Sequence, residues 1–263
     1  MLEKTSIFAR AWLPLCAASQ LAQRGDYISA TIGGWPLFAI RDDASIRAFR
    51  NTCRHQNMMV VEKPAGRCDV LQCRYHGWQY DLDGRFIAAP ALVAPADATS
   101  PNNHLAPLAT TEWRGLIFGS LRDDLPASVA YADLAPASTG TENLAFMHAQ
   151  TTDLACNWKT FVEQRLAEHW TFQWPMLTVL AKSDTVIVEQ IVPRSFLRTR
   201  VVSFVLCPES GRADLSATAA RAIQDAVPPI EAIQHRYASG DTRAIDVPAA
   251  HAFRARIRSA TTA

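Results

Sequence analysis

The chain has almost no net charge of either sign. Its 263 residues include 26 lysines and arginines against 25 aspartates and glutamates, which leaves a net charge of +1 with histidine neutral. Nucleic acids and anionic membranes attract proteins through a strongly basic surface, and so balanced a composition offers no such field. The composition therefore predicts no nucleic-acid partner and no membrane partner.

Long apolar runs, internal repeats and a disulfide framework are also missing. The first apolar stretch, residues 12–18, is too short to span a bilayer, and Pro14 interrupts it as a signal-peptide core. Six cysteines follow no framework spacing, so reduced and buried thiols are expected at those outside the motif below, which are Cys16, Cys68, Cys156 and Cys207. These features are typical of a cytoplasmic protein with one large domain or two modest ones.

What the chain does contain is a pair of mixed cysteine and histidine motifs. Cys53-Arg54-His55 is followed, after residues 56–72, by Cys73-Arg74-Tyr75-His76. Each motif supplies a thiolate and then an imidazole, so each can give one ligand to each of two irons. One iron with two sulfurs and another with two ring nitrogens is the arrangement of a Rieske [2Fe–2S] cluster. The sequence therefore predicts that Cys53, His55, Cys73 and His76 hold such a cluster.

Zinc is the alternative occupant, because two cysteines and two histidines are also a zinc ligand set. Zinc sites usually pair cysteine with cysteine and histidine with histidine, with two to four residues between the thiols. The mixed pairs of this chain, with Gly77 and Trp78 directly after the second, favour the iron–sulfur cluster over zinc.

Residues 1–123 are predicted to form an all-β domain that carries the cluster. Short apolar runs with turn residues between them indicate strands at 27–32, 36–41, 70–73, 79–82 and 113–121. Gly33-Gly34 between the first two is typical of a hairpin turn. Residues 124–143, rich in proline, alanine and serine, are predicted as a linker with at most one helical turn.

Residues 144–263 have a mixed pattern that predicts a second domain. The elements expected are a helix over 157–170, paired strands over 186–193 and 197–206, and a helix over 215–237. Pro228-Pro229 should break the last helix, because proline lacks the N–H that the helix needs. The arginine-rich residues 251–263 are expected to form an exposed or partner-docking tail.

The motifs resemble those of one family, the α subunits of Rieske non-haem iron oxygenases, which hydroxylate rings or demethylate. The segments that carry the resemblance are Asn51-Thr52-Cys53-Arg54-His55, Cys73-Arg74-Tyr75-His76-Gly77-Trp78, Trp113-Arg114-Gly115-Leu116-Ile117-Phe118 and Asn157-Trp158-Lys159. The resemblance implies an α+β protein with an all-β Rieske [2Fe–2S] domain and then a truncated helix-grip (START/Bet v1-like) domain of the catalytic type. It also implies that Trp78 packs over the second ligand loop. Asn57 stands where the family has glycine, and asparagine tolerates a positive φ.

The same resemblance implies a mononuclear Fe(II) held by two histidines and a carboxylate, but the sequence lacks these ligands. The family places both histidines just after the Asn-Trp-Lys helix. One alignment puts Thr171 and Met176 there, and a shorter one puts Trp170 and Pro175 there. His169 is the one imidazole nearby, and a packed or exposed helix histidine is the more ordinary interpretation of it.

The carboxylate ligand is missing as well. Against Glu231 and Gln234 as landmarks, its position falls on Ala226, and Asp225 beside it points about 100° away on a helix. The segment after Pro175 that forms much of the family's substrate pocket is also absent from the sequence. We therefore expect no mononuclear Fe(II) in a domain that keeps the shell of the catalytic domain.

In the family, α subunits assemble in trimers, and electrons pass from one subunit's cluster to the neighbour's mononuclear iron. We therefore expect an accessory, α-like electron-transfer subunit in a trimeric or hexameric hetero-oligomeric Rieske oxygenase. Its partners would be a catalytic α subunit and a reductase or ferredoxin. Glu168 falls on the family's bridging acid and is a candidate remnant of the electron relay, with a solvated helix residue as the equal alternative. No residue is predicted to be catalytic.

Three other functions fit the same residues. The chain could be an active ring-hydroxylating or demethylating oxygenase with unusual iron ligands drawn from His169, Asp225 or Glu231. It could be a standalone ferredoxin-like carrier, although a carrier has no need of residues 144–263. It could also be a non-catalytic scaffold or a redox sensor. The sequence is silent on a substrate.

Overall fold

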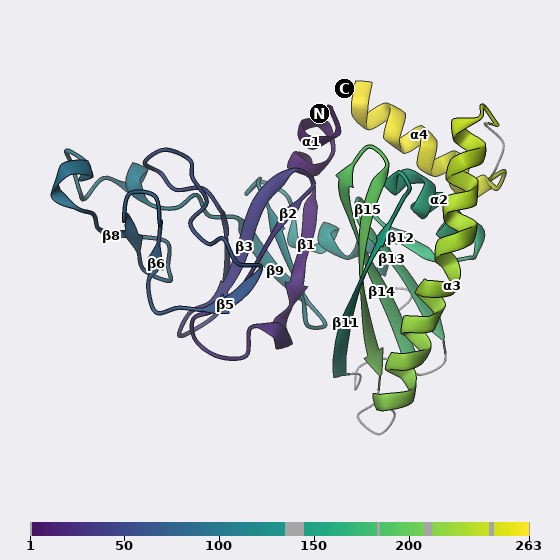
Figure 1. Cartoon of the computed structure of the whole chain (residues 1–263), viewed down its shortest axis with the longest axis horizontal. Helices are drawn as coiled ribbons and strands as arrows, with labels where there is room; N and C mark the ends of the chain where they lie inside the picture. Colours follow the sequence, from purple (N-terminus) through teal and green to yellow (C-terminus); the bar gives the residue numbers. More distant parts are fainter. Residues whose placement is uncertain (1, 135–144, 183–184, 208–211, 242–244, 263) are drawn as a thin grey trace. The chain divides into compact units, whose positions relative to one another are not determined.

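The computed structural model describes residues 2–134, 145–182, 185–207, 212–241 and 245–262, which divide into two units (Figure 1). One unit runs from Ala9 to Ala127, and the other contains Ser128 onward together with the residues up to Phe8. The division lies inside the predicted linker, of which residues 135–143 fall outside the described residues.

The N-terminal segment differs from the prediction, which assigned it to the cluster-bearing domain. Helix α1 (Leu2–Ser6) groups with the second unit because its side chains bind there. The Trp158 indole N–H donates to Glu3 at 2.9 Å, and the ring of Phe8 lies 5.7 Å from that of Trp158. Contacts of this kind between distant segments leave no trace in local sequence patterns.

Three antiparallel sheets form the Ala9–Ala127 unit, with the strand orders β1-β10-β9, β4-β3-β2-β5 and β6-β7-β8. The strands are β1 (Trp12–Ala17), β2 (Asp26–Ile32), β3 (Trp35–Arg41), β4 (Ile46–Arg50), β5 (Ala65–Arg67), β6 (Leu71–Gln72), β7 (Gln79–Tyr80), β8 (Phe86–Ala88), β9 (Ala109–Trp113) and β10 (Leu116–Ser120). One apolar cluster joins the second sheet to the third and includes both motif cysteines. The candidate site is therefore built on the core of this unit.

Two turns in this unit test the sequence predictions. The hairpin of β2 and β3 is confirmed: Ile32 pairs with Trp35, and Gly33 and Gly34 both have positive φ, as a tight hairpin turn requires. The single strand predicted over residues 113–121 is wrong. Arg114 and Gly115 both adopt positive φ and turn the chain, so that β9 and β10 form a second hairpin.

The second unit is a five-stranded antiparallel sheet with helices beside it (Figure 1). Its strand order is β11-β15-β14-β13-β12, and the long helix α3 packs against β11 and β15. The elements are η5 (Ala127–Ala130), η6 (Ala132–Leu134), β11 (Ala145–Leu154), α2 (Trp158–Ala167), β12 (Thr171–Gln173), β13 (Leu177–Lys182), β14 (Thr185–Ser195), β15 (Arg198–Cys207), α3 (Arg212–Ala238) and α4 (Pro248–Thr262). The predicted α+β class, with an all-β domain followed by a helix-grip domain, is confirmed.

The predicted helix break at Pro228-Pro229 is wrong, because helix α3 continues through both prolines. A proline in a helix leaves the carbonyl four residues earlier without a donor, here the carbonyls of Gln224 and Asp225. Both of these residues and both prolines are exposed, so water can satisfy the freed carbonyls. The helix therefore persists on its solvent side.

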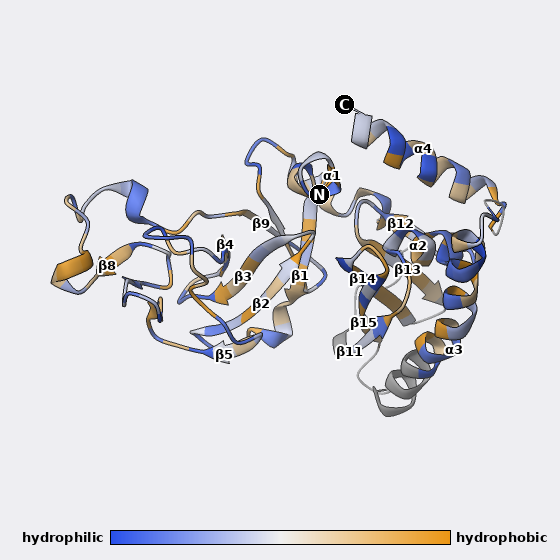
Figure 2. Ribbon diagram, turned by 45° about the horizontal axis from the view of Figure 1, so that its top comes forward, coloured by the Kyte–Doolittle hydropathy of each residue, from blue (hydrophilic) through white to orange (hydrophobic). Residues whose placement is uncertain are grey.

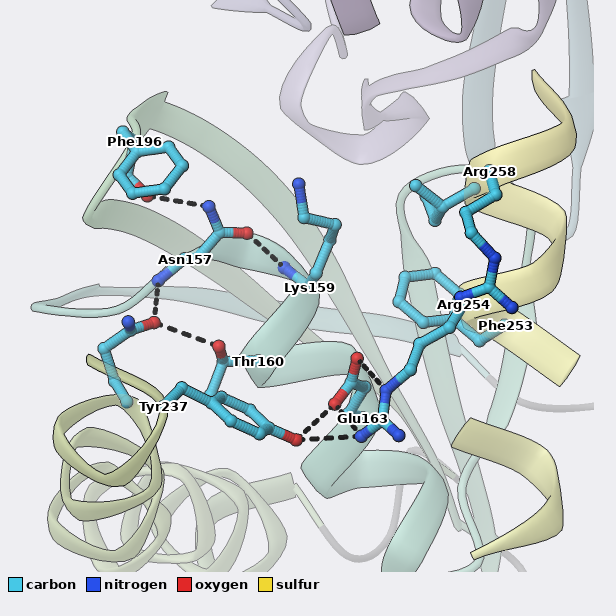
Figure 3. A pocket seen from close by; sticks show the side chains of 11 residues that line it. Asn157, Lys159, Thr160, Glu163, Phe196, Tyr237, Phe253, Arg254 and Arg258 are labelled. Carbon is cyan, nitrogen blue, oxygen red and sulfur yellow. Dashed lines mark hydrogen bonds and ion pairs between the residues drawn. The ribbon is translucent and has the colours of Figure 1, made fainter. Parts of the chain in front are cut away.

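The predicted exposed tail is also wrong, because residues 248–262 form helix α4, which packs on the same unit through Ala250, Phe253 and Ile257. Figure 2 shows hydrophilic and hydrophobic residues alternating along α4, as in an amphipathic surface helix. Arg254 anchors it with two hydrogen bonds to the Glu163 carboxylate on α2, at 2.9 and 2.7 Å (Figure 3). None of the described helices is long and apolar enough to cross a membrane.

Gly84→Ala should destabilise the first unit by about 3 kcal/mol, because two penalties add there. Gly84 has φ +79°, and a Cβ would lie 2.4 Å from Cε1 of the buried Phe49. Gly240→Ala is the matched control: φ is +93° but nothing lies within 4 Å, so about 1 kcal/mol is expected. Urea denaturation followed by tryptophan fluorescence measures the unfolding free energy of both variants. Equal losses of unfolding free energy in the two variants would contradict the predicted clash with Phe49.

Candidate metal centre

The two ligand motifs form loops with the same backbone pattern. In the first, the Cys53 N–H donates to the Met58 carbonyl at 2.7 Å, and the Asn57 N–H donates to the Cys53 carbonyl at 2.9 Å. In the second, the Cys73 N–H donates to the Trp78 carbonyl at 2.9 Å, and the Gly77 N–H donates to the Cys73 carbonyl at 2.8 Å. Each loop therefore turns back on itself within five residues of its cysteine.

Asn57 and Gly77 occupy the same place in these loops, four residues after the cysteine. Their φ angles are +58° and +73°, in the left-handed region. Asparagine tolerates this region better than most residues with a side chain, so the first loop keeps the shape of the second without glycine.

The tertiary structure brings the four predicted ligands together. Cys53 and Cys73 are both 1% exposed, and their thiols lie close enough to interact. The imidazole rings of His55 and His76 have centroids 4.5 Å apart. Both histidines are half-buried, so the two sulfurs lie inside the unit and the two rings lie nearer its surface.

One unsatisfied atom supports a metal at this place. His55 Nδ1 is buried and has no hydrogen-bond partner. A buried ring nitrogen is normally paired, and an unprotonated imidazole nitrogen is able to bind a metal. The donor set divides into a sulfur pair and a nitrogen pair, which fits two irons with two protein ligands each.

Tyr80 is a part of the site that sequence reasoning missed. Its hydroxyl lies 3.1 Å from Cys53 Sγ and accepts the Arg54 N–H at 3.1 Å. Because the oxygen accepts from Arg54, its own proton can be donated to the sulfur. Burial and the neighbouring Cys53 raise the pKa of Tyr80, which keeps the hydroxyl protonated as a donor. The signal was present, since Tyr80 follows Trp78 closely, but only the fold brings it to the first loop.

The sulfur environment also favours a cationic centre. Burial raises the pKa of the Cys53 thiol, which means that a bare thiolate is disfavoured at this place. A metal ion compensates such a charge and holds the cysteine as thiolate. The residues present therefore fit an iron–sulfur cluster.

Trp78 links the two loops. Its indole N–H donates to the Val93 carbonyl at 2.8 Å, and its ring stacks on His55 with centroids 5.2 Å apart and planes 6° apart. The residue belongs to the second loop, but it supports the first histidine. Tyr75 lies on the outer side of the loops, 61% exposed, with its ring 4.2 Å from that of His76.

The positions expected for mononuclear iron ligands have other roles in the second unit. His169 is exposed, has φ +64° and ends helix α2, since the His169 N–H donates to the Leu166 carbonyl and the Trp170 N–H to the Arg165 carbonyl. This is the Schellman motif of a helix C-terminus. The predicted helix over residues 157–170 therefore extends three residues too far at its C-terminal end, although its last apolar residue, Trp170, is buried as expected.

The remaining ligand positions supply no histidine. Met176 is buried at 1% exposure, while Thr171 lies in β12 and Pro175 in the turn between β12 and β13. On α3, Ala226 is buried and Asp225 is exposed, in agreement with the expected rotation between neighbouring helix residues.

The two landmark residues of α3 hold it to the start of α2. Glu231 Oε1 accepts the Ala155 N–H at 2.7 Å. Gln234 Oε1 accepts the Asn157 N–H at 2.9 Å and the Thr160 hydroxyl at 3.0 Å. These contacts preserve the shell of the domain, and they commit Glu231 to a structural hydrogen bond.

A buried ion pair fills the interior between α2 and the sheet. Arg165, 3% exposed, donates to both carboxylate oxygens of Glu189 at 2.9 and 2.6 Å, and Glu189 is 1% exposed. The Thr178 hydroxyl adds a hydrogen bond to Glu189 at 2.9 Å, and the guanidinium lies 4.5 Å over the Trp170 ring. Although burial opposes the charge, the carboxylates beside Arg165 raise its pKa, so the guanidinium stays charged.

Glu168, the predicted remnant of the bridging acid, belongs to the same network. It accepts from Arg165 Nη1 at 2.8 Å and from Gln164 at 2.7 Å, and its side chain is 35% exposed. It is therefore neither a freely solvated residue nor a buried one, but an acid held at the edge of the domain by a buried cation.

Comparisons with known proteins agree with the cluster motifs. Residues 11–109 match the model of the Rieske [2Fe-2S] domain. Over 175 residues, the chain is 35% identical to benzene 1,2-dioxygenase subunit alpha of Pseudomonas putida, covering 62% of this chain and 38% of that one. It is 29% identical over 172 residues to the carnitine monooxygenase oxygenase subunit of Escherichia coli, covering 62% and 46%. The chain thus spans less than half the length of these relatives.

Solved structures extend the likeness to the second unit. The apo form of the quaternary ammonium Rieske monooxygenase CntA matches with a TM-score of 0.79 at 20% identity, covering 99% of this chain and 91% of that one. Naphthalene 1,2-dioxygenase with indole bound matches with a TM-score of 0.69 at 18% identity, covering 85% and 72%. At such identities the likeness establishes the fold.

Tyr80→Phe should lower the reduction potential of the cluster by about 60 mV, the equivalent of a tenfold change for a one-electron couple. The hydrogen bond to Cys53 Sγ stabilises the more negative, reduced state, and phenylalanine removes it without changing the packing. Tyr75→Phe is the matched control. It removes the hydroxyl of an exposed tyrosine and should leave the reduction potential unchanged. Protein-film voltammetry measures both, and an unchanged Tyr80→Phe potential would exclude the proposed donor.

Arg165→Met should cost about 3–5 kcal/mol of unfolding free energy, because Glu189 is then buried without a partner. The double variant Arg165→Met, Glu189→Leu should recover most of this loss, since both charges are removed. Arg200→Met breaks the exposed pair with Asp153 and should cost at most about 1 kcal/mol. Urea denaturation measures the unfolding free energy of each variant. If Arg165→Met were as stable as the wild type, Arg165 would not be needed to pair the buried Glu189 carboxylate.

Proposed function

Because the chain carries a Rieske [2Fe–2S] domain and is homologous to the α subunits of Rieske oxygenases, we propose that it is an electron-transfer subunit of such an oxygenase. In this proposal it receives electrons from a reductase or ferredoxin and passes them to the mononuclear iron of a catalytic α subunit. The observation that carries the proposal is the contrast between a complete set of cluster ligands and the residues found at the second metal's positions.

Cys53, His55, Cys73 and His76 would hold the cluster. When bound, a Rieske cluster supplies one-electron transfer at a potential that histidine ligation raises, in the broad range of about −150 to +300 mV. The protein's contribution is to bury the sulfurs, to aim the Tyr80 hydroxyl at Cys53 and to clamp the His55 ring against Trp78. The half-buried imidazoles are the part of the site nearest to solvent and so the natural exit for an electron.

The second unit supports a role without oxygen activation. The two histidine positions hold threonine and methionine in one alignment and tryptophan and proline in the other, and the carboxylate position holds alanine. In the interior, the charges of Arg165 and Glu189 balance each other. His169, Asp225 and Glu231, the candidates for an unusual iron site, are a helix cap, an exposed residue and a structural acceptor respectively. No mononuclear iron is therefore proposed in this chain.

The acceptor would lie on another subunit. Donor and acceptor on different chains allow one subunit to supply electrons that another consumes, in a trimeric or hexameric assembly. Glu168, held at the domain edge by Arg165, is the residue proposed to face a partner's cluster.

The isolated chain should contain two irons, take up one electron and show no substrate-dependent oxygen uptake. In the complex that the tagged full-length chain forms with its oxygenase, Cys73→Ala should reduce turnover to background, because the cluster is lost. His169→Ala is the control and should leave turnover unchanged, because this residue only caps a helix. Metal analysis and oxygen-electrode measurements give the readouts.

Three irons per chain with oxygen uptake by the chain alone would replace this proposal with an active oxygenase, the activity named in the matched relatives. Unchanged turnover of the Cys73→Ala complex would instead indicate a scaffold or sensor.

A further inference from the structure

The two ligand loops are closed at their base in different ways. The second loop, residues 73–78, lies between strands β6 and β7, which pair Leu71 with Tyr80 across its base. The first loop comes shortly after β4, and residues 51–64, all of which the structure describes, include no strand. The first loop therefore needs something other than a strand ladder to hold its two ends together.

The Asn51 side chain supplies this closure. Its Oδ1 accepts the N–H groups of Val60 and Val61, both at 3.0 Å, and its Nδ2 donates to the Val61 carbonyl at 2.7 Å. Asn51 lies two residues before Cys53, whereas Val60 and Val61 lie on the returning end of the loop. An amide side chain has the same donor and acceptor groups as the backbone, so Asn51 bonds to the returning chain as a neighbouring strand would.

Asn51 is itself buried and fixed on the sheet. It is 1% exposed, and its backbone N–H donates to the carbonyl of Pro36 on β3 at 2.8 Å. The remaining hydrogen of Nδ2 goes to Ser29 Oγ on β2 at 2.9 Å. The side-chain amide therefore uses two donors and accepts two hydrogen bonds, a combination that aspartate and serine cannot match. The sheet holds the amide, and the amide holds the loop.

The closure matters to the ligands because the first loop meets residues that belong to the second loop or directly follow it. Cys53 Sγ lies 3.1 Å from the Tyr80 hydroxyl, and the His55 ring stacks on Trp78. Hydrogen bonds weaken steeply as their geometry departs from the optimum. A displacement of the first loop would therefore change the surroundings of both its ligands at once.

We propose that Asn51 is the positioning residue of the first ligand loop, and that its amide fixes Cys53 and His55 against the second loop. The inference concerns the cluster that a Rieske [2Fe-2S] domain carries, so it holds whether or not the chain also activates oxygen. An asparagine that only stabilised the fold would change the unfolding free energy and leave the reduction potential as it is.

Protein-film voltammetry of the cluster-loaded full chain tests the proposal with Asn51→Ala. The variant should have a lower reduction potential, because a displaced Cys53 loses part of its hydrogen bond from Tyr80. In the Tyr80→Phe background the same substitution should lower the potential by less than half as much, since that hydrogen bond is already absent. An unchanged potential in Asn51→Ala, or an equal shift in both backgrounds, would overturn the placement of Cys53 by Asn51.

Release of the cluster to the chelator EDTA, followed by the loss of visible absorbance, gives a second measurement. Release requires the ligand loop to open, and one hydrogen bond changes such an equilibrium about fivefold. Ser29→Ala removes one hydrogen bond of Asn51 and should speed release about fivefold, whereas Asn51→Ala should speed it at least about tenfold. Because Ser29→Ala keeps the asparagine, it tests the proposal even if Asn51→Ala does not fold.

Asp42→Ala is the matched control for both measurements. Asp42 is 6% exposed and closes the turn between β3 and β4, where it accepts the N–H groups of Ala44 at 2.7 Å and Ser45 at 2.5 Å. This turn is outside both ligand loops, so the variant should lose unfolding free energy but keep the wild-type potential and release rate. Wild-type release in Ser29→Ala, or release as fast in Asp42→Ala as in Asn51→Ala, would show that Asn51 only stabilises the fold.

Discussion

The chemistry of this chain depends on the backbone of two loops that must each reverse direction within five residues. A cysteine N–H bonded across the loop and a left-handed residue four positions later meet that requirement in both. The reversal places the two sulfurs in the core and leaves the histidine rings nearer the surface. Once the loops have this shape, burial of the thiols makes a cationic centre favourable, and Tyr80 and Trp78 can act on the sulfur and the ring.

The second unit holds paired charges in its interior. The Arg165 guanidinium occupies the interior, and both Glu189 oxygens and one Glu168 oxygen accept from it. A buried pair of this kind adds little net stability, but it gives the buried Glu189 carboxylate a partner. The hydrogen bonds of Glu231 and Gln234 to the start of α2 maintain the shell around it.

The proposed electron-transfer role rests on these two arrangements. The four predicted cluster ligands all lie in the first unit. Helix α4, anchored through Arg254 to Glu163, adds a face to the second unit.

Local patterns predicted what depends on neighbouring residues. The Gly33-Gly34 hairpin, the paired strands β14 and β15, the α+β class and the grouping of Cys53, His55, Cys73 and His76 all follow from residue types at short spacing. Predictions failed where distant groups or solvent decide. The Pro228-Pro229 helix continues because its freed carbonyls face water, and the expected tail is a helix whose Arg254 is held by the distant Glu163.

The amino-acid sequence by itself determined the nature of the redox centre, because ligand atoms and their spacing are covalent properties of the chain. It also places no histidine at the positions that the family resemblance assigns to a second metal, in either alignment. Only the tertiary structure decided that Tyr80 donates to Cys53, that Arg165 pairs with Glu189, and that Asn51 donates to Ser29. Those partners are distant in sequence, and hydrogen bonds and ion pairs act over a few ångströms in space whatever the number of residues between them.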